Sequence, residues 1–232
     1  MQVSGKLFLA SQMKLVRASV FIAELRSVLD QYVKDDPLSA NIEFVVDHPQ
    51  VSVSWKGIGL LPGAIVGDAI HNMRTALDLM ASDLVRINEG NDKSVYFPFA
   101  GDETKLAAEI KKKNFDRAGD DAVALLRTFA PYKGGNESLR AIHDLDIEDK
   151  HRALILTVGT FNFEFDGAID LENIDQRTAS IIAKDVEFVF PPDGPLAGWP
   201  LLETMEKLLK LVQGIVEAFA GMVALRSSKG QR

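Results

Sequence analysis

Hydrophobic residues recur at alternating spacings of three and four in three long segments of the chain. On an α-helix this spacing places them in one stripe, so the pattern predicts long amphipathic helices over residues 9–33, 63–89 and 200–225. Stripes of this regularity are typical of helices that pack together in a bundle. The stripe residues are Leu15, Ala18, Ile22, Leu25, Leu29 and Tyr32 in the first helix, Val66, Ile70, Met73, Leu77, Met80, Leu84 and Ile87 in the second, and Leu201, Met205, Leu208, Val212, Ile215, Phe219 and Met222 in the third.

Shorter elements connect these helices. Within residues 103–156 the pattern predicts helices over 103–113, 119–129 and 137–156. β-Branched and aromatic residues predict strands over 41–46 and 51–55, joined by the turn Asp47-His48-Pro49-Gln50, and further strands over 161–169 and 181–190. The four strands are expected to form one small sheet against the bundle. We therefore predict a mainly α fold, a helical bundle with a small β-hairpin or sheet insertion, in a single domain over residues 1–232.

The composition fits a globular domain with a substantial core. Hydrophobic residues make up 47% and charged residues 25% of the 232 residues, which are ordinary proportions. The chain has no cysteine, which excludes disulfides, thiolate nucleophiles and cysteine-ligated zinc. A net charge of −7 argues against a broad nucleic-acid-binding surface, although it is compatible with a small basic site.

No targeting or membrane segment is expected. The apolar run at residues 7–10 is interrupted by polar residues soon after it begins, unlike a signal peptide. The helix expected over 200–225 is punctuated by lysine, glutamine and glutamate, so we expect no stretch with the length and apolarity of a membrane span. These patterns predict a soluble, cytoplasmic protein without membrane contact.

The first candidate site is the sequence Gly67-Asp68-Ala69-Ile70-His71-Asn72-Met73-Arg74-Thr75-Ala76-Leu77-Asp78. On a helix, His71, Arg74 and Asp78 lie three and four residues apart and share one flank of the apolar stripe. An imidazole and a guanidinium beside a carboxylate can bind phosphate or take part in acid–base chemistry. Spacing alone favours a simpler interpretation, a solvated helix face with an ordinary Arg74–Asp78 pair.

The second candidate site is the sequence His143-Asp144-Leu145-Asp146-Ile147-Glu148-Asp149-Lys150-His151-Arg152. The apolar stripe of this helix begins at Leu139 and Ile142 and then reaches Asp146 and Asp149. Either the helix turns toward Leu145, or these carboxylates point into the bundle, where they need a cation, a hydrogen-bond donor or a metal. The available cationic partners are Arg74, Lys150, His151 and Arg152. A buried ion network that orients the helices explains this pattern at least as well as catalysis does.

Metal and cofactor chemistry has little support in the sequence. Imidazole and carboxylate ligands suit zinc, iron, manganese or nickel, but the chain has no His-Glu-x-x-His or Glu-x-x-His pair, so we assign no metal and no cofactor. It also has no glycine-rich nucleotide-binding motif and no Gly-x-Ser-x-Gly elbow. The residues that could contribute to a metal site are His71, Asp78, His143, Asp146, Asp149 and His151.

The motifs resemble a family of uncharacterised bacterial and phage-associated proteins. The resemblance runs from about Leu15 to Leu156, and it is carried by the order in which the motifs occur. They are Gly67-Asp68-x-x-His71-Asn72-x-Arg74-x-Ala76-Leu77-Asp78, then Phe97-Pro98, then Pro131-Tyr132, then Leu145-x-x-x-Asp149-Lys150-His151-Arg152. The resemblance implies a bacterial or phage-associated protein and no particular reaction.

A more distant resemblance is to HEPN domains, helical bundles that often act as metal-independent RNases. Their signature is an arginine followed five positions later by a histidine on the same helix. The resemblance implies that the histidine moves protons at the ribose 2′-hydroxyl and that the arginine steadies the phosphate. Arg74 fits, but Leu79 stands at the histidine position and cannot transfer a proton. An RNase of this type would need His71 or His151 instead.

Three hypotheses of function follow, and the sequence does not decide whether the protein is an enzyme. The first is a helical protein whose polar site binds a small anionic ligand, a nucleotide or a partner chain. The second is a HEPN-like, metal-independent RNase of a defence or toxin system, and the third is a metal-dependent hydrolase. The candidate catalytic residues are His71, Arg74, Asp78 and His151, and the candidate ligand-binding residues are Asp68, Asn72, Asp149, Lys150 and Arg152.

All three hypotheses require the two candidate sites to meet in space. The regular helical stripes also predict a homodimer, because a stripe that is not covered within one chain must be covered by another copy.

Overall fold

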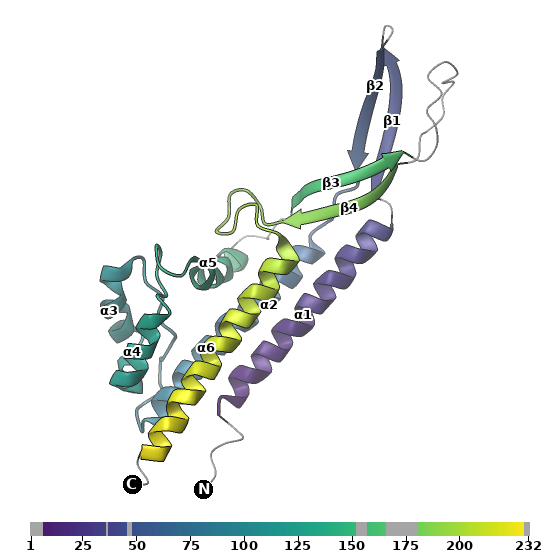
Figure 1. Cartoon of the computed structure of the whole chain (residues 1–232). Coiled ribbons are helices and arrows are strands. Elements are labelled where there is room, and N and C mark those ends of the chain that lie inside the picture. The colour runs from purple at the N-terminus through teal and green to yellow at the C-terminus, as the bar shows by residue number, and fades with distance from the viewer. Residues whose placement is uncertain (1–6, 36, 46–47, 152–156, 166–180, 230–232) are drawn as a thin grey trace.

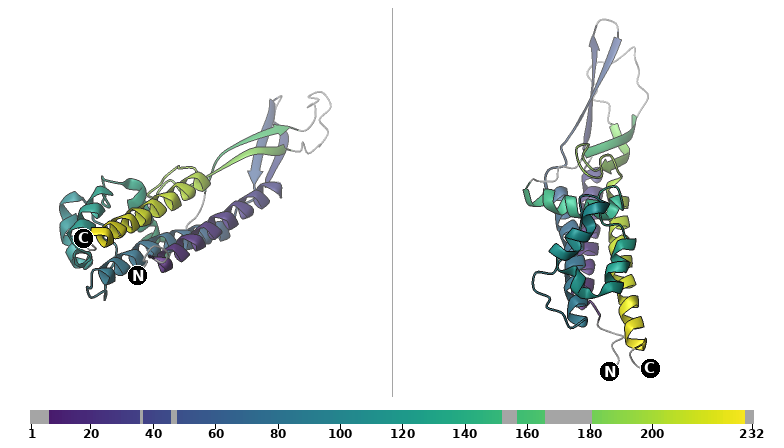
Figure 2. Two further views of the ribbon diagram at one scale, coloured as in Figure 1. Left: turned by 60° about the horizontal axis from the view of Figure 1, so that its bottom comes forward. Right: turned by 90° about the vertical axis from the view of Figure 1, so that its left-hand side faces the viewer.

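The computed structural model describes residues 7–35, 37–45, 48–151, 157–165 and 181–229. Three long helices pack against one another, namely α1 (Leu9–Lys34), α2 (Leu61–Ile87) and α6 (Leu201–Lys229) (Figure 1). α1 and α6 run in opposite directions along the bundle (Figure 2). The mainly α fold and the helical bundle are confirmed, and the three helices lie close to their expected ranges.

The predicted stripes of the three long helices form most of the core. Leu25, Leu29, Met73, Leu77 and other stripe residues are buried. Burying each such side chain contributes about 1.5–3 kcal/mol before the entropy cost of folding is subtracted. The Ser11 hydroxyl donates a 2.8 Å hydrogen bond to the Ala76 carbonyl oxygen and joins α1 to α2. Apart from residues near the helix ends, the stripes are covered within the chain, so they no longer argue for a dimer.

α1 carries a second apolar stripe that the sequence analysis missed. Leu9, Met13, Val16 and Val20 are 54%, 54%, 53% and 46% exposed. Their spacing of four, three and four places them on the face opposite the buried stripe. α1 is therefore apolar on two faces, and within the chain only one of them is covered.

Short helices occupy one side of the long ones (Figures 1 and 2). They are α3 (Glu103–Lys112), the 3₁₀ turn η1 (Phe115–Ala118), α4 (Asp120–Thr128) and α5 (Glu137–His151). The Asp102 side chain caps α3 by accepting a hydrogen bond from the Lys105 backbone N–H. α5 packs on α2, which brings the second candidate site beside the first.

The strands form two separate antiparallel hairpins, and the expectation of one small sheet is wrong. β1 (Leu38–Val45) pairs with β2 (His48–Trp55), and β3 (Thr157–Phe165) pairs with β4 (Ile181–Val189). Each strand pairs along one edge with its own hairpin partner. His48, Pro49 and Gln50, expected in a turn, lie in β2, because the pairing continues to Val45 and His48. The connection at residues 46–47 lies outside the described residues.

α6 corrects one expectation about membranes. An 18-residue window within Leu201–Ser228 has a mean hydropathy of 1.7, so this segment is long and apolar enough to cross a membrane by length and composition. The core helix of a soluble protein passes the same test. One face of α6 packs into the bundle through Leu208, Val212 and Phe219. The absence of membrane contact remains a prediction.

Candidate functional site

The two candidate sites meet where α5 packs on α2. His71 Nδ1 lies 2.8 Å from Asp146 Oδ1, although the two residues are 75 positions apart in the sequence. Asp146 is 5% exposed, whereas the His71 side chain is 50% exposed. The pair thus links a buried carboxylate to an imidazole at the protein surface.

Asp146 occupies a position in the inward face of α5. Leu139, Ile142 and Leu145 are buried on the same helix, so the helix turns toward Leu145 and also directs a carboxylate inward. His71 is a partner of this carboxylate. A buried carboxylate is costly without a hydrogen-bond donor, and the imidazole N–H supplies one.

Asp146 also fixes how His71 presents its two nitrogen atoms. Nδ1 donates its proton to the carboxylate, because an ionised carboxylate only accepts hydrogen bonds. Nε2 then lies 3.4 Å from the Thr75 hydroxyl oxygen on the next turn of α2. Nε2 is therefore the atom available to a ligand or a transferred proton.

Arg74 and Asp78 form a second, more buried pair. Arg74 Nη1 donates to Asp78 Oδ1 at 2.5 Å, and Arg74 Nη2 donates to the Phe97 carbonyl oxygen at 3.2 Å. Asp78 Oδ1 accepts the Phe97 backbone N–H at 2.8 Å. Burial raises the pKa of Asp78, and its contacts with Arg74 and the Phe97 N–H oppose that rise. The pair binds both backbone groups of Phe97.

His143 is a half-buried member of the same cluster. Its ring stacks on Phe99 with centroids 4.7 Å apart and planes 5° apart, and the Arg74 guanidinium lies over Phe99 at 4.7 Å. Its Nδ1 atom is buried without a hydrogen-bond partner in the described structure. Burial, together with the charges of Arg74 and Arg140, lowers the pKa of His143 to about 4. The ring is therefore neutral at physiological pH.

Arg140 completes the contacts between α5 and the segment that follows α2. It donates to both oxygens of Asp144, one turn away, and its Nη1 donates to the Ala100 carbonyl oxygen at 2.7 Å. The Ala100 N–H in turn donates to the Pro131 carbonyl oxygen at 3.0 Å. We call residues 97–100 the clamped loop, because Arg74, Asp78 and Arg140 bind its backbone and Phe99 lies against Arg74 and His143.

Contacts with the clamped loop give Arg74 and Asp78 of the first motif a structural role. The guanidinium of Arg74 is engaged by Asp78, Phe97 and Phe99, and the residue is only 8% exposed. This environment does not present Arg74 to a phosphate in solution. His71 differs, because half of its side chain is exposed.

The remaining predicted site residues are distributed as follows. Asp68 is exposed, and Asn72 is buried and donates to the Asp68 carbonyl oxygen at 2.7 Å. The structure does not describe the side chains of Asp149, Lys150 and His151, and Arg152 lies outside the described residues altogether. The roles predicted for these residues therefore remain predictions.

Sequence reasoning identified Arg74 and Asp78, which hold part of the clamped loop, but missed the contribution of Arg140 and Asp144. These two residues had a detectable signal, since they are four apart on a helix. Asp146 was identified because it interrupts an apolar stripe. The contact of Phe99 with His143 depends on the tertiary fold.

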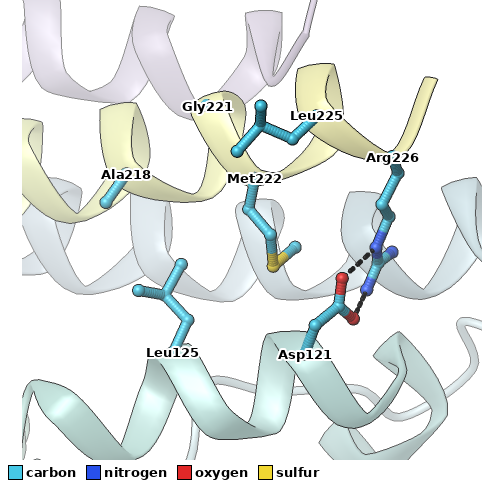
Figure 3. A pocket seen from close by; sticks show the side chains of 7 residues that line it. All are labelled: Asp121, Leu125, Ala218, Gly221, Met222, Leu225 and Arg226. Atoms are coloured by element: carbon cyan, nitrogen blue, oxygen red, sulfur yellow. Dashed lines mark hydrogen bonds and ion pairs between the residues drawn. The ribbon is translucent and has the colours of Figure 1, made fainter. Parts of the chain in front are cut away.

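The described part of the chain contains no group of three or more histidine, aspartate or glutamate side chains placed to hold a metal. A hollow of about 570 Å³ opens between α4 and α6, as Figure 3 shows. Its lining is mostly apolar, and the Asp121–Arg226 ion pair at one end is already formed. The lining residues are Asp121, Leu125, Ala218, Gly221, Met222, Leu225 and Arg226.

Comparison of the chain with models of protein families, with curated proteins and with solved structures gives no match. The candidate site therefore has to be interpreted from its own geometry.

Proposed function

We propose that the protein binds a small anionic ligand, with a phosphate-bearing nucleotide as the preferred class, at the junction of α2 and α5. The observation that carries this proposal is the half-exposed imidazole of His71, whose inner nitrogen is held by the buried Asp146. Once Nε2 is also protonated, the fixed imidazolium donates from Nε2 to an anion without first losing side-chain freedom.

The charges around His71 set the position of the ligand. Arg74 and Arg140 are engaged by carboxylates and by the clamped loop. α5 continues beyond Asp146 to His151, and its last residues include Lys150 and His151. Arg152 follows them in the sequence, outside the described residues. An anion bound at His71 would thus lie toward this end of α5, where cations also complement the helix dipole.

Binding is tested by calorimetry and thermal shift with nucleoside mono- and diphosphates, using inorganic phosphate to isolate the contribution of the anion. His71→Gln removes the imidazole and its fixed Nε2 atom. It is expected to weaken binding about 10- to 100-fold, because a hydrogen bond to a charged group contributes about 1.5–3 kcal/mol.

The matched control for this test is His48→Gln in β2, which makes the same replacement on the hairpin. It should bind as the wild-type protein does. Equal affinity of the His71→Gln and wild-type proteins would contradict the proposed site, as would the absence of any stabilising phosphate compound.

A metal-independent RNase is the second candidate, and one observation favours it. With its proton on Nδ1, a neutral His71 has Nε2 free to accept a proton, as a general base at a ribose 2′-hydroxyl must. The engaged guanidinium of Arg74 counts against the HEPN assignment of roles, so the phosphate would need another cation.

The RNase hypothesis predicts cleavage of generic RNA in the presence of a chelator. His71→Ala should abolish that cleavage, and His48→Ala should leave it unchanged. Loss of activity in chelator, together with stoichiometric metal in the purified protein, would instead support the metal-dependent hydrolase.

A further inference from the structure

Thr75 and Thr128 both lie in helices, but their hydroxyls have different partners. A threonine hydroxyl in a helix usually donates to a backbone carbonyl of the preceding turn, as Thr128 does to Leu125 at 2.7 Å. The Thr75 hydroxyl oxygen instead lies 3.4 Å from His71 Nε2, on the surface of α2. Thr75 is itself partly exposed, so a molecule in solution can reach this hydroxyl.

Thr75, His71 and Asp146 form a chain of three polar side chains. The buried carboxylate of Asp146 accepts the Nδ1 proton of His71 at 2.8 Å. The neutral imidazole then has its lone pair on Nε2, which is the atom that contacts the Thr75 hydroxyl. A nucleophilic hydroxyl, a base within reach of it and a third group that orients the base are the parts of a hydrolase triad, and the contact between nucleophile and base is often long before substrate binds.

We propose that Thr75 is a nucleophile that accepts the acyl group of activated carboxylic esters. His71 is its general base, and Asp146 is a positioning residue that fixes the imidazole. This activity goes beyond the binding of an anion at His71. It uses the same imidazole, but it requires no negative charge on the ester.

The reaction needs no component other than the ester and water. Thr75 Oγ1 forms a bond to the carbonyl carbon while its proton passes to His71 Nε2. The bond from that carbon to the leaving oxygen then breaks, and the leaving group takes the proton from Nε2. Water attacks the acyl-threonine in the same way, which releases the carboxylic acid and restores the hydroxyl. Asp146 stabilises the imidazolium that forms in each half of the reaction.

The position of Thr75 in α2 restricts the class of ester. Thr75 lies inside the helix, away from both ends, where backbone N–H groups donate to carbonyl groups of the same helix. The backbone of α2 around Thr75 therefore supplies no donor to the oxyanion that forms when the carbonyl carbon is attacked. Esters with a good leaving group, such as aryl esters, depend least on such a donor.

The first test treats the full chain with a fluorophosphonate, whose phosphorus atom is attacked by a nucleophilic hydroxyl with loss of fluoride. Peptide mapping by mass spectrometry should find the probe on Thr75 of the wild-type protein. Thr75→Val removes the hydroxyl at nearly constant volume and should not be labelled, whereas Thr75→Ser keeps a hydroxyl and should be. The matched control, Thr128→Val, makes the same replacement in α4 and should be labelled as the wild-type protein is.

The second test measures acyl transfer with para-nitrophenyl acetate. The wild-type protein should release a burst of nitrophenolate equal to the concentration of chains. His71→Gln should slow the burst about 100- to 10,000-fold, because a general base contributes a factor of about that size. Asp146→Asn should also slow it, and nitrogen NMR of the imidazole should show that the His71 proton has left Nδ1, since the asparagine amide can donate to that atom.

Four results would overturn the inference: a wild-type protein without the probe on Thr75, a burst that persists in Thr75→Val, a burst rate that is unchanged in His71→Gln, or an unchanged imidazole proton in Asp146→Asn. Thermal unfolding of each variant verifies that it is folded.

The binding proposal can fail separately from this inference. A wild-type protein that binds phosphate compounds but is not labelled would contradict only the nucleophile. A labelled protein that binds no phosphate compound would contradict only the anion site and would leave the nucleophile supported.

Discussion

His143 is a residue whose environment makes the protein sensitive to acid. Its Nδ1 atom is buried without a partner in the described structure, and Arg74 and Arg140 oppose a positive charge on the ring. Asp144 and Asp146 favour that charge, but they do not outweigh burial and the two arginines. Protonation would therefore place an uncompensated charge against Phe99 and the clamped loop.

This environment predicts a loss of stability in acid. The pKa of His143 is about 4 in the folded protein and about 6.5 in the unfolded chain, so the unfolded state binds the proton more readily. The contribution is fully present above about pH 6.5 and is lost as the pH falls toward 4. We expect it to be about 1–2 kcal/mol after allowance for the partly exposed ring.

Denaturant unfolding at several pH values measures this contribution. His143→Phe retains the stacked ring but has no titrating group, so its stability should change less than that of the wild-type protein between pH 6.5 and 4. Identical pH profiles for the two proteins would rule out this role for His143.

Arg74 and Asp78 should contribute to the stability of the protein as one coupled pair. Arg74→Met leaves a largely buried carboxylate without its cation and is expected to cost about 3–5 kcal/mol. Asp78→Asn keeps an acceptor for the Phe97 N–H but leaves the guanidinium unpaired. The double variant should lose less stability than the sum of the two single losses, by at least about 1 kcal/mol. Additive losses in a double-mutant cycle would show that the pair is not coupled.

At the scale of elements, the glycines are of two kinds: one is fixed by close packing of the backbone, and others lie inside a helix, where only helix propensity disfavours them. A Cβ atom at Gly135, in the connection before α5, would lie 2.6 Å from the Ala130 carbonyl oxygen and 2.7 Å from the Tyr132 ring. Gly214 and Gly221 lie inside α6, and a Cβ atom there would meet no atom within 4 Å. The first glycine is required by close packing, and the other two are not required by any contact within the described residues.

Alanine substitution should therefore have opposite effects at these positions. Gly214→Ala is expected to stabilise the protein by about 0.5–1 kcal/mol, because glycine is that much less favourable than alanine inside a helix. Gly135→Ala should destabilise it, since a backbone oxygen cannot yield as a flexible side chain can. Thermal unfolding of the two variants provides the comparison, and a destabilised Gly214→Ala protein would indicate that another surface approaches α6 there.

At the scale of the whole molecule, one hydrophobic core joins the long helices to the segment around Phe97 and Phe115. Leu77 is fully buried near the middle of α2, whereas Leu225 near the end of α6 is 63% exposed. Removing a side chain from a close-packed interior costs both its burial and the cavity left behind.

Leu77→Ala should therefore cost about 2–5 kcal/mol, and Leu225→Ala should change the free energy of unfolding by less than about 0.5 kcal/mol. Chemical denaturation of both variants measures the difference. A large loss in Leu225→Ala would mean that the hollow between α4 and α6 is filled by something outside the chain.

The sequence by itself determined the helices and the chemistry of their faces. Spacings of three and four depend only on neighbouring residues and helix geometry, so α1, α2 and α6 were predictable to within a few residues. The same local rule marked His71, Arg74 and Asp78 as neighbours and singled out Asp146 as a carboxylate in an apolar stripe. The outer stripe of α1 was also present in the sequence, although one buried stripe already explained the helix.

Only the tertiary structure decided which partner each charge has. The contact of His71 with Asp146 and the engagement of Arg74 by Phe97 join residues that are far apart in the chain. Such pairings depend on how α5 and the clamped loop pack against α2, and no local spacing contains that information. The same limit applies to the strands. Strand patterns predict pairing partners within a hairpin but not the order of strands between hairpins, so the sequence did not show that the four strands form two separate sheets.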